Sequence, residues 1–97
     1  MDVEFLSQAE KELDDGINYY EALTPNLGND FLHEVHLAIE RIRLYPNAWQ
    51  QISNRTRRCL IKRFPYGVIY QIRKDVILII AVAHLHRKPG YWNKRSL

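Results

Sequence analysis

Cations and aromatic side chains follow directly on the most apolar stretch of the chain. Residues 81–95 read A-V-A-H-L-H-R-K-P-G-Y-W-N-K-R and bring Arg87, Tyr91, Trp92 and Arg95 close together in sequence. These residue types suit phosphate pairing and base stacking, and they also dominate the hot spots of protein interfaces. The structural alternative is that Trp92 fills the base of the core and Tyr91 covers a strand edge. Because no acid neighbours the cluster in sequence, we expect it to bind a target.

Four histidines are further candidates for proton transfer or metal binding. His84 and His86 share a face of a strand end by period two, so they form an acid–base pair, a metal pair or simply a strand terminus. We favour a structural or supporting role for His84. His33 and His36 are spaced i, i+3 on a predicted helix without a nearby cysteine, so we expect a solvated pair and neither a metal nor a cofactor.

Charge is distributed unevenly along the chain. Residues 1–50 carry three Lys or Arg against ten Asp or Glu, a net charge of −7, whereas residues 51–97 carry eleven against one, a net charge of +10. The overall charge of +3 therefore hides a cationic surface, which attracts polyanions or an acidic protein partner. The simpler alternative is that Lys and Arg protect strand edges from pairing with other chains.

Composition predicts one soluble domain over residues 1–97. The 46% hydrophobic content suffices for a single core at this length. The longest apolar run, residues 76–83, is far shorter than the roughly 20 residues of a membrane-spanning helix, and the first residues lack a cationic leader. The single cysteine, Cys59, has no internal disulfide partner. We therefore expect an unexported, cytoplasmic protein without membrane contact.

Two amphipathic helices are predicted in the first half. Ser7-Gln8-Ala9-Glu10 matches a capping box, which starts a helix by satisfying two orphan backbone donors. A turn over residues 24–28 makes the next helix, from Asn26 or Gly28 to Arg43, pack antiparallel to the first. The apolar stripes of the two helices are Ala9, Leu13, Ile17 and Tyr20, and Phe31, Val35, Ala38, Ile39 and Ile42.

The second half has the periodicity of strands. Residues 58–64 alternate, Pro65-Tyr66-Gly67 reads as a turn, and residues 68–73 form the next strand. Lys74-Asp75 then connects to residues 76–83, a central strand covered on both faces. Residues 3–6 add an outer strand. The predicted α+β fold is β-α-α-β-β-β with a short C-terminal helix after Pro89, in which an antiparallel sheet packs on a two-helix hairpin and Lys and Arg collect on its other face.

The order of several motifs resembles toxins of the RelE/ParE family of bacterial type II toxin–antitoxin systems. The motifs are S-Q-A-E-K-E-L, N-Y-Y-E, G-N-D-F-L-H-E-V, L-Y-P, R-R-C-L-I-K-R-F-P-Y-G-V-I-Y-Q-I and A-V-A-H-L-H-R-K-P-G-Y-W. The first is generic, but F-P-Y-x-x-x-Y followed by an apolar strand, A-H, Arg and P-x-Y-W is fairly specific. The resemblance spans nearly the whole chain and implies the same order of elements.

The resemblance implies one of two mechanisms. RelE-like members cut messenger RNA in the ribosomal A site with basic residues. There Arg87 would bind phosphate, Tyr91 would stack on or activate the substrate, and His86 would be the general base. Those nucleases carry an arginine directly after the tyrosine that is Tyr66 here, where this chain has Gly67. Arg58, Lys62 or Arg63 are the possible substitutes for it on the neighbouring strand.

ParE-like members, which poison DNA gyrase, are therefore the better match. Their plasmid-stabilising, growth-inhibiting role implies a cognate antitoxin that covers the basic groove. The surface expected to bind the target or RNA comprises Arg58, Lys62, Arg63, Arg87, Lys88, Tyr91, Trp92 and Arg95. The expected target is gyrase or another large target, and the alternatives are a nuclease acting on ribosome-bound messenger RNA and a non-toxic adaptor that keeps only the fold.

Overall fold

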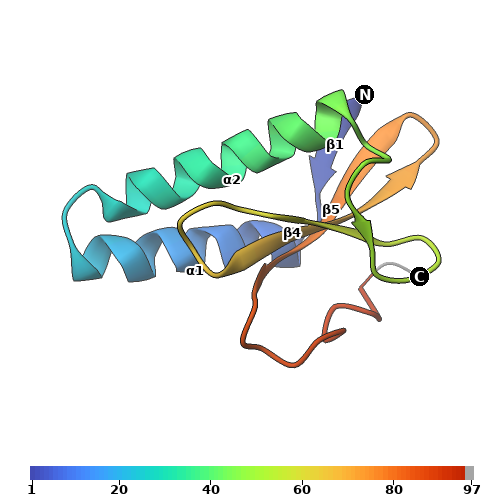
Figure 1. Ribbon diagram of the computed structural model, residues 1–97. Helices are drawn as coiled ribbons and strands as arrows, with labels where there is room; N and C mark the ends of the chain where they lie inside the picture. The colour runs from blue at the N-terminus through green and yellow to red at the C-terminus, as the bar shows by residue number, and fades with distance from the viewer. Residues whose placement is uncertain (96–97) are drawn as a thin grey trace.

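The computed structural model describes residues 1–95 as an α+β domain with two helices and five strands (Figure 1). In chain order the elements are β1 (Asp2–Phe5), α1 (Ser7–Leu23), α2 (Leu27–Leu44), β2 (Gln50–Gln51), β3 (Arg57–Leu60), β4 (Tyr66–Arg73) and β5 (Val76–His84). The predicted order of elements is confirmed. It lacked β2, because two residues are too few to show a period, and it contained a C-terminal helix that turns replace in the described part of the chain.

The central strand of the sheet is β5, as its continuous apolar sequence predicted. The strand order is β1-β5-β4-β3-β2, and β5 pairs antiparallel with β4 but parallel with β1. The prediction of an entirely antiparallel sheet is therefore wrong at this edge, and the sheet is mixed. Apolar alternation over four residues is the same for a parallel and an antiparallel strand, so the sequence of β1 could not predict its direction relative to β5.

A β-bulge in β5 changes which of its side chains face the helices. Ile69 and Tyr70 of β4 pair with residues 81 and 79 of β5, which leaves Ile80 with no residue opposite it. Before the bulge, odd-numbered residues such as Ile79 pack in the helix-side core, and after it Val82 does so. Such a bulge inserts one residue and shifts the alternation of the strand.

The strand predicted over residues 58–64 ends early. β3 covers only residues 57–60, after which the chain leaves the sheet and Arg63 adopts a φ of 72°. Tyr66 and Gly67, predicted as part of a turn, are the first residues of β4. The apolar alternation continues beyond the end of the strand because Ile61 and Phe64 still bury their side chains in the helix-side core.

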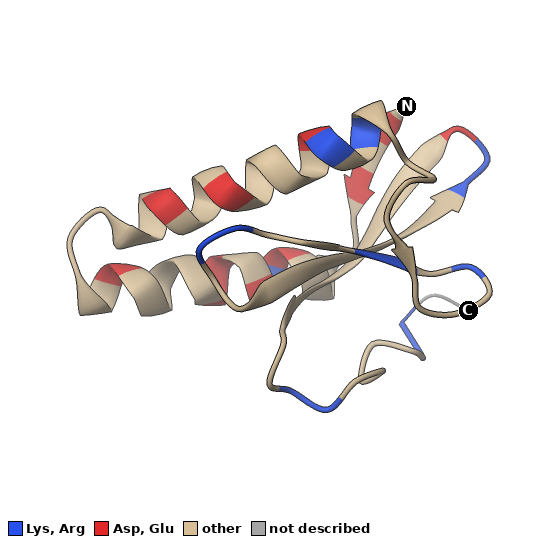
Figure 2. Cartoon of the chain, viewed as in Figure 1, with Lys and Arg blue, Asp and Glu red and all other residues tan. Residues whose placement is uncertain are grey.

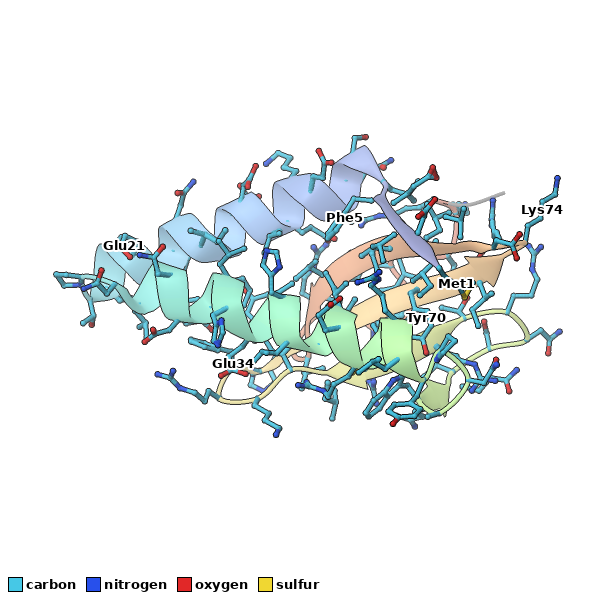
Figure 3. The ribbon with its side chains drawn as sticks, turned by 90° about the horizontal axis from the view of Figure 1, so that it is seen from above. Met1, Phe5, Glu21, Glu34, Tyr70 and Lys74 are labelled. Atoms are coloured by element: carbon cyan, nitrogen blue, oxygen red, sulfur yellow. The ribbon has the colours of Figure 1, made fainter. Side chains whose placement is uncertain are left out.

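The two helices form the predicted hairpin and lie side by side over one face of the sheet (Figure 3). The capping box is not formed. The helix begins after Leu6, whose carbonyl accepts the N–H groups of Ala9 and Glu10 at 3.0 Å, while the Ser7 hydroxyl donates to Gln8 at 3.4 Å. Because β1 leads directly into α1, Ser7 already has helical backbone and is not available as a cap.

Close contact and a carboxylate fix the turn end of the hairpin. A Cβ on Gly16 would lie 2.6 Å from Cε2 of Phe31, so only glycine permits this approach of the two helices. Glu21 lies at the turn end (Figure 3), and its carboxylate accepts the backbone N–H groups of Asn26 and Gly28, each at 3.0 Å. These are orphan donors at the start of α2.

The C-terminal segment, residues 85–95, covers the middle of the other sheet face. The short helix predicted after Pro89 is replaced in the described part of this segment by turns, such as that from Gly90 to Asn93 at 3.0 Å. Trp92 is 9% exposed. It packs in a second core with Ile69, Ile80, Ala81 and Ala83. This face is therefore not free, and the burial of Trp92 fits the structural role rather than target binding.

Substituting Trp92 with alanine should destabilise the fold. Because its indole fills the second core, we expect Trp92→Ala to lower the free energy of unfolding by about 3 to 5 kcal/mol in urea titrations. The matched control is Tyr45→Ala, since Tyr45 is 65% exposed, and it should change stability by less than about 0.5 kcal/mol. Equal stability of the two variants would contradict a structural role for Trp92.

Candidate functional site

One carboxylate of α1 gathers the cations and the tyrosine of the C-terminal segment. Glu12 accepts a hydrogen bond from the Tyr91 hydroxyl at 2.5 Å and from Arg95 Nη1 and Nη2 at 2.8 and 3.1 Å. It also accepts the backbone N–H of Val82 at 3.1 Å and lies 3.7 Å from Arg87 Nη1. We call these five residues the Glu12 clamp.

The clamp closes an open edge of the sheet. β1 pairs with β5 only over residues 76–79, so β5 extends beyond its partner. Past the bulge, the N–H of Val82 is bound by Glu12 and the carbonyl of Ile80 accepts from Arg95 Nη1 at 3.2 Å. Two side chains thus satisfy backbone groups that an added strand would otherwise bind.

Both arginines of the clamp lie against the Tyr91 ring. The guanidinium carbon of Arg87 is 3.7 Å from the ring centroid and that of Arg95 is 5.0 Å from it. The side chain of Arg95 is only 17% exposed, whereas that of Arg87 is 57% exposed. Arg95 is therefore an internal anchor, and Arg87 is the clamp cation that solvent reaches.

Burial and hydrogen bonding shift the pKa values of Tyr91 and Arg95 in the clamp. The pKa of Tyr91 is raised, first by burial and then by its hydrogen bond to the Glu12 carboxylate, against the lowering effect of Arg87 and Arg95. The pKa of Arg95 is raised by its hydrogen bond to Glu12, an effect larger than the opposing desolvation. Tyr91 therefore stays neutral, keeps its hydroxyl proton and donates a hydrogen bond to Glu12.

A groove of about 300 Å³ lies between α1 and the end of β5. Its lining residues are Glu12, Asp15, Gly16, Tyr19, Tyr66, Val82, His84, Arg87 and Tyr91. The rings of Tyr66 and His84 are in edge contact at 5.0 Å, and His84 Nδ1 accepts the backbone N–H of His86 at 3.1 Å. His84 thus supports the turn after β5, while His86 is exposed.

The remaining predicted site residues do not join the clamp. Lys62 and Lys88 are exposed on loops, and Arg63 pairs with Asp30 of α2 at 3.3 Å. Figure 2 shows Asp and Glu along the two helices and β1, and Lys and Arg mainly on the strands and loops of the sheet. Of the predicted site residues, the clamp therefore brings together Arg87, Tyr91 and Arg95, while Trp92 contacts Tyr91 from the second core, with ring centroids 5.1 Å apart.

Arg58 occupies the space that a side chain at position 67 would need. A Cβ on Gly67 would lie 3.0 Å from Cγ and 3.1 Å from Cδ of Arg58. In register, Arg58 lies opposite Ile69, whose side chain packs with Trp92, so Arg58 is on the sheet face away from the helices. The glycine that departs from the nuclease pattern thus makes room for an arginine of the adjacent strand.

Sequence reasoning missed Glu12. It belongs to a helix face with several acids, a pattern that is typical of a solvent-exposed surface. Its partners Val82, Tyr91 and Arg95 lie 70 to 83 residues further along the chain. The one local signal was its spacing from the buried residues Ala9 and Gly16, which places it beside the face that packs on the sheet.

Comparison with known proteins identifies the family. The protein-family model described as ParE toxin of type II toxin-antitoxin system, parDE, matches residues 3–89, which is most of the chain. The chain belongs to the ParE toxin family. The RelE/ParE resemblance is thereby confirmed. No curated protein matches this ParE-family chain.

A solved structure supports the fold of this ParE-family toxin. The structure titled "Chromosomal ParDE TA system from P. aeruginosa" superimposes with a TM-score of 0.78 at 14% identity, covering 89% of this chain and 97% of the other. At that identity the likeness concerns the fold alone. Neither helix within residues 1–95 is long and apolar enough to cross a membrane.

Removing the clamp carboxylate should loosen the C-terminal segment. In Glu12→Ala the buried Arg95 guanidinium loses its counter-charge and the Val82 N–H loses its acceptor. We expect the free energy of unfolding to fall by about 2 to 4 kcal/mol. We also expect the Val82 amide to exchange its hydrogen faster in NMR, because no strand covers it.

The matched control is Asp14→Ala, which removes an exposed carboxylate from the same helix. It should leave stability within about 0.5 kcal/mol and Val82 exchange unchanged. Protection of Val82 that survives in Glu12→Ala would contradict the assignment.

The raised tyrosine pKa values predict a loss of stability in alkali. Tyr91 ionises in the unfolded chain near its ordinary pKa of 10 but at higher pH in the folded protein. The contribution of Tyr91 to folding stability is therefore complete below pH 10, and it is lost as the pH rises towards the pKa that Tyr91 has in the folded protein. Tyr70, whose pKa burial raises to about 12, acts in the same direction.

We therefore expect Tyr91→Phe to show a shallower fall in unfolding free energy above pH 10 than the wild type. Identical pH profiles for the two proteins would contradict the environment assigned to Tyr91.

Proposed function

We propose that this ParE-family toxin inhibits growth by binding DNA gyrase through the surface around Arg87, and that it does not cut RNA. The Glu12 clamp is the observation that carries the proposal. It holds two of the three clustered site residues, Tyr91 and Arg95, in internal contacts with one carboxylate. Only the Arg87 guanidinium remains largely exposed, stacked on Tyr91 and so fixed in direction.

The chemistry of the groove disfavours RNA cleavage. A nuclease needs a group that accepts the 2′-hydroxyl proton and cations that stabilise a developing phosphate charge. Here the raised pKa of Tyr91 keeps its hydroxyl protonated, and that proton is directed at Glu12. Glu12 and Asp15 line the same groove as Arg87 and would repel a phosphate.

Neutralisation by a cognate antitoxin is part of the proposal. The membership in a toxin–antitoxin family supports such a partner. Because residues 51–97 carry the excess of Lys and Arg, an acidic or amphipathic antitoxin segment is the complementary partner. Burying Arg87 under such a segment would keep the toxin silent.

Gyrase inhibition should depend on Arg87. We expect the purified protein to inhibit DNA supercoiling by gyrase, and Arg87→Ala to need at least about tenfold more protein for the same inhibition, as for loss of an interface hot spot. Arg43→Ala is the matched control, because it removes the same charge from the exposed end of α2. It should inhibit like the wild type.

Several results would contradict the proposal. Undiminished supercoiling with no trapped cleavage complex at high excess of toxin would exclude gyrase as the target. Codon-phased messenger RNA ends in induced cells, lost in Arg87→Ala, would instead establish the nuclease. Normal growth after expression without any antitoxin would favour the non-toxic adaptor.

A further inference from the structure

A second cationic surface lies apart from the Glu12 clamp. Three hollows of about 290, 340 and 220 Å³ follow one another around the turn between β2 and β3. The third shares Asn54 and Arg55 with the second, but its Arg57 and Ile72 belong to the helix side of the sheet, so it lies around the turn from the other two. The first two share Ser53, Trp92 and Asn93 and form one groove on the sheet face away from the helices. We call it the arginine groove.

Each of the three hollows contains an arginine whose charge is not neutralised. Arg58 lines the first hollow, Arg55 the second and third, and Arg57 the third. Arg58 and Arg57 donate to neutral oxygens: Arg58 Nη2 to Gln50 Oε1 at 2.8 Å, and Arg57 Nη1 to the carbonyl of Trp49 at 2.8 Å. Arg58 Nε is buried without a hydrogen-bond partner.

No acid interrupts this surface. The residues that line the three hollows include no Asp or Glu, and the sequence has none between Glu40 and Asp75. The rest of the lining offers amides and hydroxyls, among them Asn54, Asn93 and Ser53. The groove differs in this respect from the groove at Arg87, where two carboxylates are present.

The backbone of the 52–56 turn and the Arg58 side chain are held in place before any ligand arrives. The 52–56 turn is closed by the Ile52 N–H, which donates to the Thr56 carbonyl at 2.9 Å. The Thr56 hydroxyl in turn accepts a buried hydrogen bond from Gln71 of β4 at 3.1 Å. The Arg58 stem lies flat over Gly67, whose missing side chain leaves that space. Such preorganisation reduces the entropy lost on binding.

We propose that the arginine groove binds the phosphodiester backbone of a nucleic acid without reading its sequence. Arginine pairs with phosphate in bidentate geometry, and amides and hydroxyls are the other side chains that contact phosphates. Two arginines, Arg58 and Arg55, in adjoining hollows with neutral polar groups between them match a ligand of repeated negative charge. This binding site is separate from Arg87 and does not depend on gyrase being the target.

Fluorescence anisotropy at several salt concentrations tests the proposal. The probes are a short DNA duplex of mixed sequence and the corresponding single-stranded DNA and RNA. With two phosphate contacts, from Arg55 and Arg58, we expect the logarithm of the duplex association constant to fall against the logarithm of salt concentration with a slope of about −2. A scrambled duplex should bind equally well. Comparison of the three probes distinguishes DNA from RNA as the source of the backbone.

Arg55→Ala is the decisive variant, because Arg55 is exposed on the turn. It should make the slope shallower by about 1, whereas Arg43→Ala and Arg87→Ala should leave the slope unchanged. Arg58→Ala, after its folding is verified by circular dichroism, should have the same effect as Arg55→Ala.

Absence of salt-dependent binding to all three probes would overturn the proposal. So would a slope in Arg55→Ala equal to that of the wild type. Displacement of the duplex by polyglutamate as readily as by unlabelled duplex would show an acidic peptide site instead. Failure of gyrase inhibition alone would leave these results unaffected.

Discussion

The contact of Glu12 with the C-terminal segment is the interaction on which the arrangement of this toxin depends. A single carboxylate of α1 binds Tyr91, Arg95 and the backbone of β5, and lies near Arg87. It closes the edge of β5 that β1 leaves uncovered and fixes the segment that carries Trp92 into the second core. The same contact determines which side chain remains outside. Arg87 is exposed because Arg95 and Tyr91 occupy the inner positions on Glu12.

The Lys and Arg side chains in the second half of the chain have two kinds of surroundings. The cations near α1 lie beside carboxylates. Arg95 anchors the C-terminal segment to Glu12, whereas Arg87 is exposed and held in a fixed direction. Cations around the 52–56 turn meet only neutral oxygens, and their field extends into solvent. One small domain thereby carries a groove of mixed charge at Arg87 and a separate cationic groove, and these two surfaces suit ligands of different chemistry.

Much of the fold could be predicted because it depends on local periodicity. The helical hairpin, the outer strand and the buried β5 followed from apolar spacing, and the order of motifs indicated the family. The direction of β1, the bulge at Ile80 and the turns that replace the predicted helix over residues 90–95 could not be predicted, since they depend on contacts between distant segments. The site was predicted only in part. The cluster at Arg87 was visible as a run of residue types, whereas Glu12, the residue that organises it, is ordinary in its local sequence.

A double-mutant cycle between Glu12 and Arg95 tests the central claim most directly. Both residues would be replaced by alanine, singly and together, and the free energy of unfolding measured for all four proteins. If the carboxylate and guanidinium hold the C-terminal segment to α1, the two substitutions are not additive, and the coupling free energy is about 1 to 3 kcal/mol. Additive effects, with a coupling free energy near zero, would contradict the account.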